Sequence, residues 1–99
     1  MGKPNPRWEC RAYLDWVKTQ PCMMTGLPAD DPHHIIGVGG LSGMALTAPD
    51  WAAMPLTRGA HDQIGQDSEL WAQQWEWVAR TLGKAIEEGV LVFRGTSDG

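Results

Sequence analysis

The stretch DPHHII, residues 31–36, decides the fold of this chain, since it joins two adjacent histidines to two β-branched residues. Residues 33–36 are predicted to form a short strand that leads into glycines. Neighbouring side chains on a strand point to opposite faces, so His33 and His34 serve one site only at a strand end or a twisted turn. Taken alone, the pair could equally be two unrelated histidines of the surface or the core.

A second segment, WAAMPLTRGAHD, is predicted to complete a small ββα unit. Its residues 51–56 are expected to form a strand that Pro55 confines to an edge or an end. Residues 58–64 are expected to form a short helix that carries His61, for which a chance position on a surface helix is the alternative. The glycine-rich stretch 37–50 between the strands is a long loop for so small a domain, and such loops are usually functional or mobile.

Helical patterns flank this unit on both sides. An N-terminal helix is predicted over residues 7–20 and ends at Pro21. It is followed by a turn-rich knuckle at residues 21–32. A long C-terminal helix is predicted to begin at residue 67 or 68 and to end before Gly89, which suits a helix C-terminus.

The tryptophans of the C-terminal helix divide into two groups. The apolar stripe of this helix is predicted to consist of Trp71, Trp75, Val78, Leu82, Ala85 and Ile86. Trp77 lies off this stripe and is expected to be exposed, as is Trp8, so base stacking or a partner contact remains an alternative for both. Residues 90–93 are expected to add a short strand.

The predicted fold class is α+β, a small ββα core flanked by an N-terminal helix and a long C-terminal helix. Residues 7–94 are expected to form one domain, with a flexible lead at 1–6 and a flexible tail at 95–99. The chain has 99 residues, 42% of them hydrophobic, which suits a single globular domain.

The composition limits the expected cellular location and the expected binding partners of the protein. No stretch approaches the roughly 20 apolar residues that a membrane span requires, and the N-terminus has no apolar segment typical of a secretory signal. Two cysteines, Cys10 and Cys22, form no disulfide framework, so a cytoplasmic location with reduced thiols is expected. The net charge of −4 speaks against non-specific DNA binding, which depends mainly on lysine and arginine.

From residue 12 to residue 92 the chain resembles a phage and prophage family of HNH-type (ββα-metal) proteins related to the recombination-enhancement nucleases. The matching motifs are Tyr13-Leu14-x-Trp16-Val17-x3-Pro21-Cys22, Gly26-x-Pro28-Ala29-Asp30-Asp31-Pro32-His33-His34-Ile35-Ile36-Gly37, Gly39-Gly40-x2-Gly43-Met44, Asp50-x4-Pro55-Leu56-Thr57-x3-His61 and Gly89-Val90-Leu91. The coupling of DPHHIIG to the PL segment that precedes His61 is the distinctive part.

The resemblance implies a role for each residue of the site. His33 and His61 would be metal ligands, and His34 would be the general base that activates water. Asp50 would orient that base by accepting its N–H, although a plain turn residue is an equal alternative. Arg58, at the start of the helix of His61, could clamp a substrate phosphate, whereas a solvated surface arginine is the simpler interpretation.

The chain also departs from the family pattern at two metal sites. Typical members hold a structural zinc through Cys-x2-Cys and Cys-x2-His, whereas this chain has Cys22-x2-Thr25 and Thr57-x2-Ala60, so loss of that zinc is expected. Many relatives also carry a histidine at the position of Gly65. The two remaining ligands favour Mg²⁺ or Mn²⁺, which keep several waters, over a catalytic Zn²⁺.

Three functions remain open on the sequence alone. The first is a metal-dependent DNA endonuclease or nickase that hydrolyses phosphodiesters in phage recombination or replication. The second is a degenerate HNH scaffold that binds a host or phage protein. The third is a nucleic-acid-binding accessory factor without catalysis.

Overall fold

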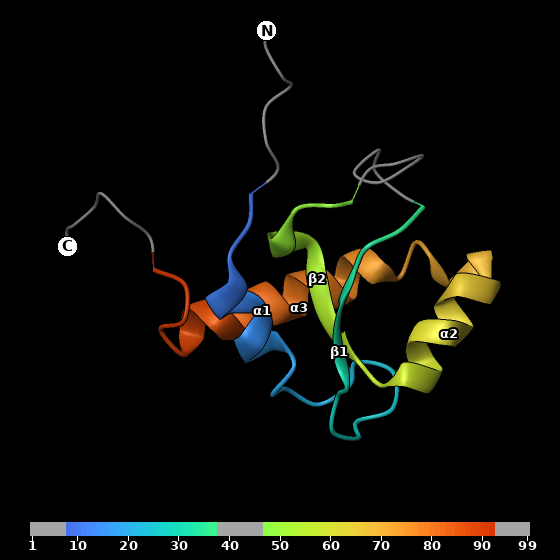
Figure 1. Ribbon diagram of the computed structural model, residues 1–99, viewed down its shortest axis with the longest axis horizontal. Helices are drawn as coiled ribbons and strands as arrows, with labels where there is room; N and C mark the ends of the chain where they lie inside the picture. The colour runs from blue at the N-terminus through green and yellow to red at the C-terminus, as the bar shows by residue number, and fades with distance from the viewer. Residues whose placement is uncertain (1–7, 38–46, 93–99) are drawn as a thin grey trace, which may run out of the picture.

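The computed structural model describes residues 8–37 and 47–92. The regular elements are helix α1 (Arg11–Val17), strand β1 (Asp31–His34), strand β2 (Ala53–Leu56), helix α2 (Arg58–Gln66) and helix α3 (Gln74–Glu87), with short 3-10 turns at Asp50–Ala52 and Ser68–Leu70. Figure 1 shows the two strands side by side at the centre of the molecule, with a helix on each flank and α3 behind them. The α+β fold is thereby confirmed, with an N-terminal helix, an antiparallel strand pair and C-terminal helices.

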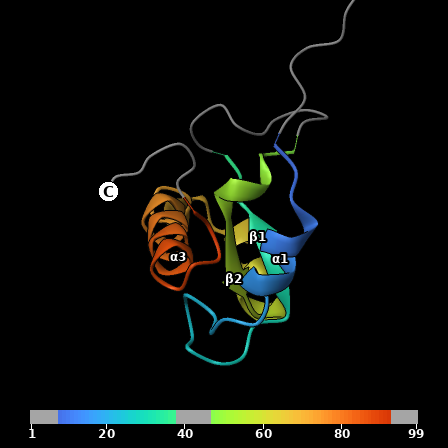
Figure 2. The same ribbon diagram turned by 90° about the vertical axis from the view of Figure 1, so that its left-hand side faces the viewer.

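The strand pair positions His33 and His34, which both belong to β1. β1 and β2 run antiparallel, with His33 opposite Met54 and His34 opposite Ala53. Pro32 and Pro55 also lie opposite each other, which a two-stranded sheet tolerates because both of its strands are edges. Every residue of β2 is buried, because α3 packs on one side of the strand pair and α1 lies on the other (Figure 2).

The strand boundaries differ from those expected. β1 begins two residues earlier and ends at His34, because the backbone of Ile36 bonds to the side chain of Gln74 instead of continuing the ladder. β2 begins at Ala53, because the three residues before it form a 3-10 turn.

The buried face of α3 also differs from the predicted stripe. Its buried residues are Gln74, Trp77, Val78, Thr81 and Ala85. Trp77 is therefore in the core, whereas Trp75 is 39% and Ile86 63% exposed. Val78 and Ala85 are buried as predicted, and Trp71 and Leu82 are partly buried against the core. The predicted phase is wrong at Trp75, Trp77 and Ile86, because the α-helix begins only at Gln74, after a 3-10 turn and irregular backbone. Trp8 is exposed, as expected.

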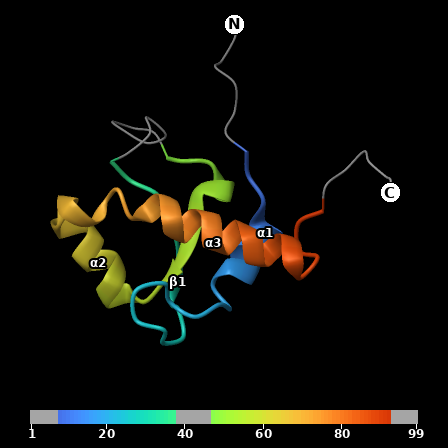
Figure 3. The same ribbon diagram turned by 180° about the vertical axis from the view of Figure 1, so that it is seen from behind.

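Two apolar clusters hold the elements together. The larger one joins the strand pair to α2 and α3 and includes Ile35, Met54 and Ile64. The smaller one joins α1 to the C-terminal half of α3 through Tyr13, Val17 and Ala85. Figure 3, which views the molecule from behind, shows α3 crossing in front of the strands to reach α1.

The ends of the helices agree only in part with expectation. α1 is shorter than predicted, with turns rather than helix over residues 18–20. Gly89 has a φ of 77° and follows α3, which confirms the expected glycine at the helix C-terminus. Residues 90–92 form no strand, so that part of the predicted strand 90–93 is wrong.

Several expectations concern residues outside the described ranges. They are the flexible lead at 1–6, the tail at 95–99, position 93 and most of the glycine-rich loop 37–50. No helix among the residues described is long and apolar enough to cross a membrane.

Candidate functional site: a histidine–aspartate pair and a histidine pair

His34 and Asp50 form a short polar contact between the end of β1 and the turn before β2. Asp50 is buried in the 3-10 turn that precedes β2, and its Oδ1 lies 2.8 Å from Nε2 of His34. Its Oδ2 accepts the backbone N–H of Cys10 at 2.7 Å, and its own N–H donates to the carbonyl of Trp8 at 2.9 Å. These contacts fix the carboxylate between the start of α1 and the end of β1.

The contact also sets the tautomer of His34. A carboxylate can only accept, so Nε2 of His34 carries the proton and Nδ1 of the neutral ring carries the lone pair. The His34 side chain is 22% exposed, so solvent reaches it. The geometry is what a base oriented by a carboxylate requires, while the catalytic role itself stays a prediction.

His33 points the other way, toward α3. It is 4% exposed, and its Nε2 lies 3.3 Å from Oε1 of Gln74. Gln74 donates its Nε2 protons to the carbonyls of Ile36 at 2.7 Å and Trp71 at 2.9 Å, which fixes its Oε1 as an acceptor. His33 therefore donates from Nε2, and Nδ1 carries the lone pair.

His61 on α2 completes a second pair. Its ring lies edge-on to that of His33, with the ring centroids 4.6 Å apart. The two rings could supply two nitrogen ligands to an ion that keeps several waters. Among residues 8–37 and 47–92, no group of three or more histidine, cysteine or acidic side chains is placed to hold a metal. The donor set thus fits only an ion held partly by water or substrate.

The structure separates the two pairs across β1. His33 and His61 lie toward α2 and α3, whereas His34 and Asp50 lie toward α1. A cavity of about 250 Å³ adjoins the His34–Asp50 pair and is lined by Glu9, Arg11, Leu14, His34 and Asp50. No sequence motif marks Glu9 or Arg11, so neither was predicted as part of the site.

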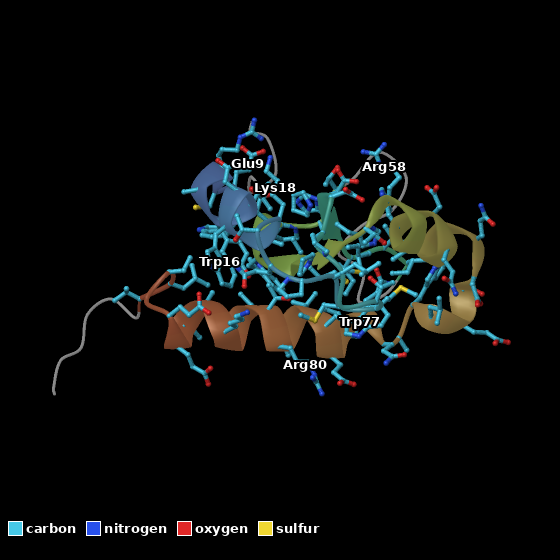
Figure 4. The ribbon with its side chains drawn as sticks, turned by 90° about the horizontal axis from the view of Figure 1, so that it is seen from below. Glu9, Trp16, Lys18, Arg58, Trp77 and Arg80 are labelled. Carbon is cyan, nitrogen blue, oxygen red and sulfur yellow. The ribbon has the colours of Figure 1, made fainter. Side chains whose placement is uncertain are left out.

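Arg58 joins neither pair. Its Nε lies 3.2 Å from Oδ2 of Asp31, and its backbone N–H donates to Oδ2 of Asp30 at 2.9 Å. Figure 4 shows Arg58 at the outer surface beside α2. Arg58, which was predicted to bind a substrate phosphate, is thus already paired with the carboxylate of Asp31.

The four positions at which the sequence resemblance implies a structural zinc, Cys22, Thr25, Thr57 and Ala60, lie close together. Sγ of Cys22 is 3.9 Å from Oγ1 of Thr57, which in turn accepts the N–H of Ala60 at the start of α2. Burial raises the pKa of Cys22, but hydrogen bonds from Thr25, Thr57 and the Met24 backbone outweigh it, and the pKa is lowered overall. In place of metal ligands, Thr57 caps α2, and Cys22 and Ala60 pack in the apolar core.

The burial of His33 makes stability depend on pH. Burial, reinforced by the charge of His61, lowers the pKa of His33 from 6.5 to about 4. The neutral ring stabilises the folded state above the unfolded pKa, and this contribution is lost as pH falls from 6.5 toward 4. We expect a loss on the order of 3 kcal/mol in the free energy of unfolding, measured by urea denaturation. A His33→Asn variant should show a clearly shallower pH dependence, and an equal slope in both proteins would refute this origin.

Comparison with known proteins places the chain in a family. Residues 1–89 match the model of the family described as protein of unknown function (DUF968). The chain is 42% identical over 89 residues to the uncharacterized protein YdfU of Escherichia coli (strain K12). The match covers 86% of this chain and spans about a quarter (25%) of that relative's length. No solved structure matches the chain significantly. The chain, with its histidine–aspartate and histidine pairs, belongs to the DUF968 family.

Proposed function

We propose that the chain is a metal-dependent DNA endonuclease or nickase of the HNH type, acting in phage recombination or replication. The observation that carries this proposal is the contact between His34 and buried Asp50 at the edge of an open cavity. A second observation supports it: His33 and His61 approach each other from a strand and from the helix that follows the strand pair. This is the arrangement that the sequence resemblance implies.

Each residue has a defined task in this proposal. Nδ1 of His34 takes a proton from the attacking water, and Asp50 stabilises the resulting imidazolium and holds the ring in place. His33 and His61 would bind a divalent ion, with Gln74 fixing the His33 tautomer that leaves Nδ1 for it. When bound, such an ion supplies positive charge for the phosphate oxygens of the transition state.

A degenerate scaffold that binds a protein or a nucleic acid without catalysis is the second candidate. The net charge of −4 favours it, as does the absence of a third protein ligand within the described residues. The two pairs also lie on opposite faces of β1, so a single substrate phosphate has to reach both sides of a strand end.

The deciding experiment is the incubation of purified protein with supercoiled plasmid in Mn²⁺ or Mg²⁺, with EDTA as the control. We expect open-circular or linear product with the ion and none with EDTA. Calorimetric titration with Mn²⁺, repeated on a His61→Ala variant, tests the ion site separately. Plasmid left unchanged under every condition would refute the nuclease, and heat of Mn²⁺ binding without cleavage would favour the scaffold.

A further inference from the structure

We infer that Arg11, rather than Arg58, holds the substrate phosphate at the His34–Asp50 site, so that the ligand of the adjoining cavity is a phosphodiester anion. This inference rests on the proposed function and names the group that would recognise its substrate. It starts from the position of Arg11, which lines the same cavity of about 250 Å³ as His34 and Asp50. At about 30 Å³ per water, that volume holds a phosphate group with several waters.

The fold ties Arg11 to the base. Arg11 is the first residue of α1, and the residue before it, Cys10, donates its N–H to the Asp50 carboxylate that orients His34. The same carboxylate therefore positions both the imidazole and the start of the helix that carries the guanidinium. A phosphate bound by Arg11 would lie next to the side chain that activates water.

Charge pairing singles out Arg11 among the cations. In the part of the chain that the structure describes, each of the other lysines and arginines has a carboxylate partner. These pairs are Lys18 with Asp15, Arg58 with Asp31, Arg80 with Glu76 and Lys84 with Glu88. Arg11 has no such pair within residues 8–37 and 47–92, and its side chain is exposed.

Among the described residues, neither carboxylate of the cavity forms an ion pair with Arg11. Both oxygens of Asp50 already accept hydrogen bonds, one from His34 and one from Cys10. Glu9 is engaged in an interaction of its own. An arginine that faces a cavity without an anionic partner suits a ligand that brings two acceptor oxygens, because guanidinium binds phosphate through two parallel N–H···O bonds.

The first test measures DNA binding without cleavage. A short fluorescein-labelled DNA duplex is titrated in EDTA by fluorescence anisotropy, at salt concentrations between about 50 and 200 mM. We expect Arg11→Ala to weaken binding roughly 10-fold at the lowest salt. It should also reduce the slope of log K against log salt by about 0.9, the value for one lost phosphate contact. Arg11→Lys should keep the slope and lose part of the affinity.

Two control variants make the test specific. Arg80→Ala removes an arginine that points away from α3 on the side opposite to Glu9, as Figure 4 shows, so it should change neither affinity nor slope. Arg58→Ala tests the residue that the sequence favoured, and we expect a smaller effect than for Arg11→Ala. A full effect at Arg58 with none at Arg11 would overturn the inference.

Cleavage kinetics separate this inference from the proposed function. If the wild-type protein cuts plasmid, Arg11→Ala should raise KM about 10-fold with a smaller change in kcat. If Arg11→Ala changes neither KM nor DNA binding, the phosphate-binding role of Arg11 is refuted, while the proposed nuclease activity still stands. An inactive wild-type protein whose DNA binding still depends on Arg11 would refute the nuclease and support the phosphate site. If the wild-type protein shows no DNA binding, both fail.

Discussion

A His34→Ala variant is expected to lose plasmid cleavage by at least about 100-fold, since general base catalysis contributes about 10² to 10⁴ to rate. The effect should fall on kcat, because the imidazole acts on the attacking water rather than on substrate binding. The measurement is the initial rate of supercoiled plasmid loss at saturating Mn²⁺. Because His34→Ala also removes a partner of buried Asp50, thermal unfolding of the variant is measured alongside, so that a loss of rate is not mistaken for a loss of folding.

Asp50→Asn provides the matched variant for this prediction. The amide keeps the size of the side chain but loses the negative charge that stabilises the His34 imidazolium, so a large loss of kcat is expected here also. Asp15→Asn, an exposed carboxylate of α1, should have no effect and controls for a change in net charge. Full activity of His34→Ala would show that the histidine is not the base and would remove the observation on which the nuclease rests.

Replacing Gln74 with leucine is expected to lower the free energy of unfolding by about 4 kcal/mol, since each buried group left without a partner costs about 1–3 kcal/mol. The change unpairs the Ile36 N–H and carbonyl and the Nε2 proton of His33 at once. Leucine is about the same size, so the loss reflects hydrogen bonding rather than a cavity. Urea denaturation followed by tryptophan fluorescence measures it.

Gln73→Leu is the control for the Gln74 variant. Gln73 is the preceding residue, is exposed and makes no side-chain cap, so its replacement should change stability by less than about 0.5 kcal/mol. An equally small effect at Gln74 would show that its four hydrogen bonds contribute little beyond those that water supplies.

The sequence predicted what local chemistry controls. Two histidines beside β-branched residues, a proline at the end of the second strand and a histidine on the next helix were sufficient for the strand pair and α2. The glycine at the end of α3 followed from its need for a positive φ. The phase of α3 could not be predicted, because it depends on where the 3-10 turn at Ser68–Leu70 gives way to the helix.

Only the site residues that belong to a sequence motif could be predicted, and the residues that reach the site through the fold could not. The contact of Asp50 with His34 followed from a family pattern, but Gln74 lies 41 residues from His33 and carries no motif. A polar residue on the buried face of α3 would have been noticed only with the correct helix phase. No sequence feature marked Arg11. It stands out only because every other described lysine or arginine has a carboxylate partner, and this pairing is seen only in the folded chain.

The packing of α1 on α3 has a consequence for synthesis on the ribosome. The helix that anchors Asp50 through Cys10 rests on Ala85, near the far end of the described chain. A nascent chain that stops short of Ala85 has every histidine but lacks the surface that holds α1 in place. The His34–Asp50 contact is therefore expected to become ordered only after synthesis has passed Ala85.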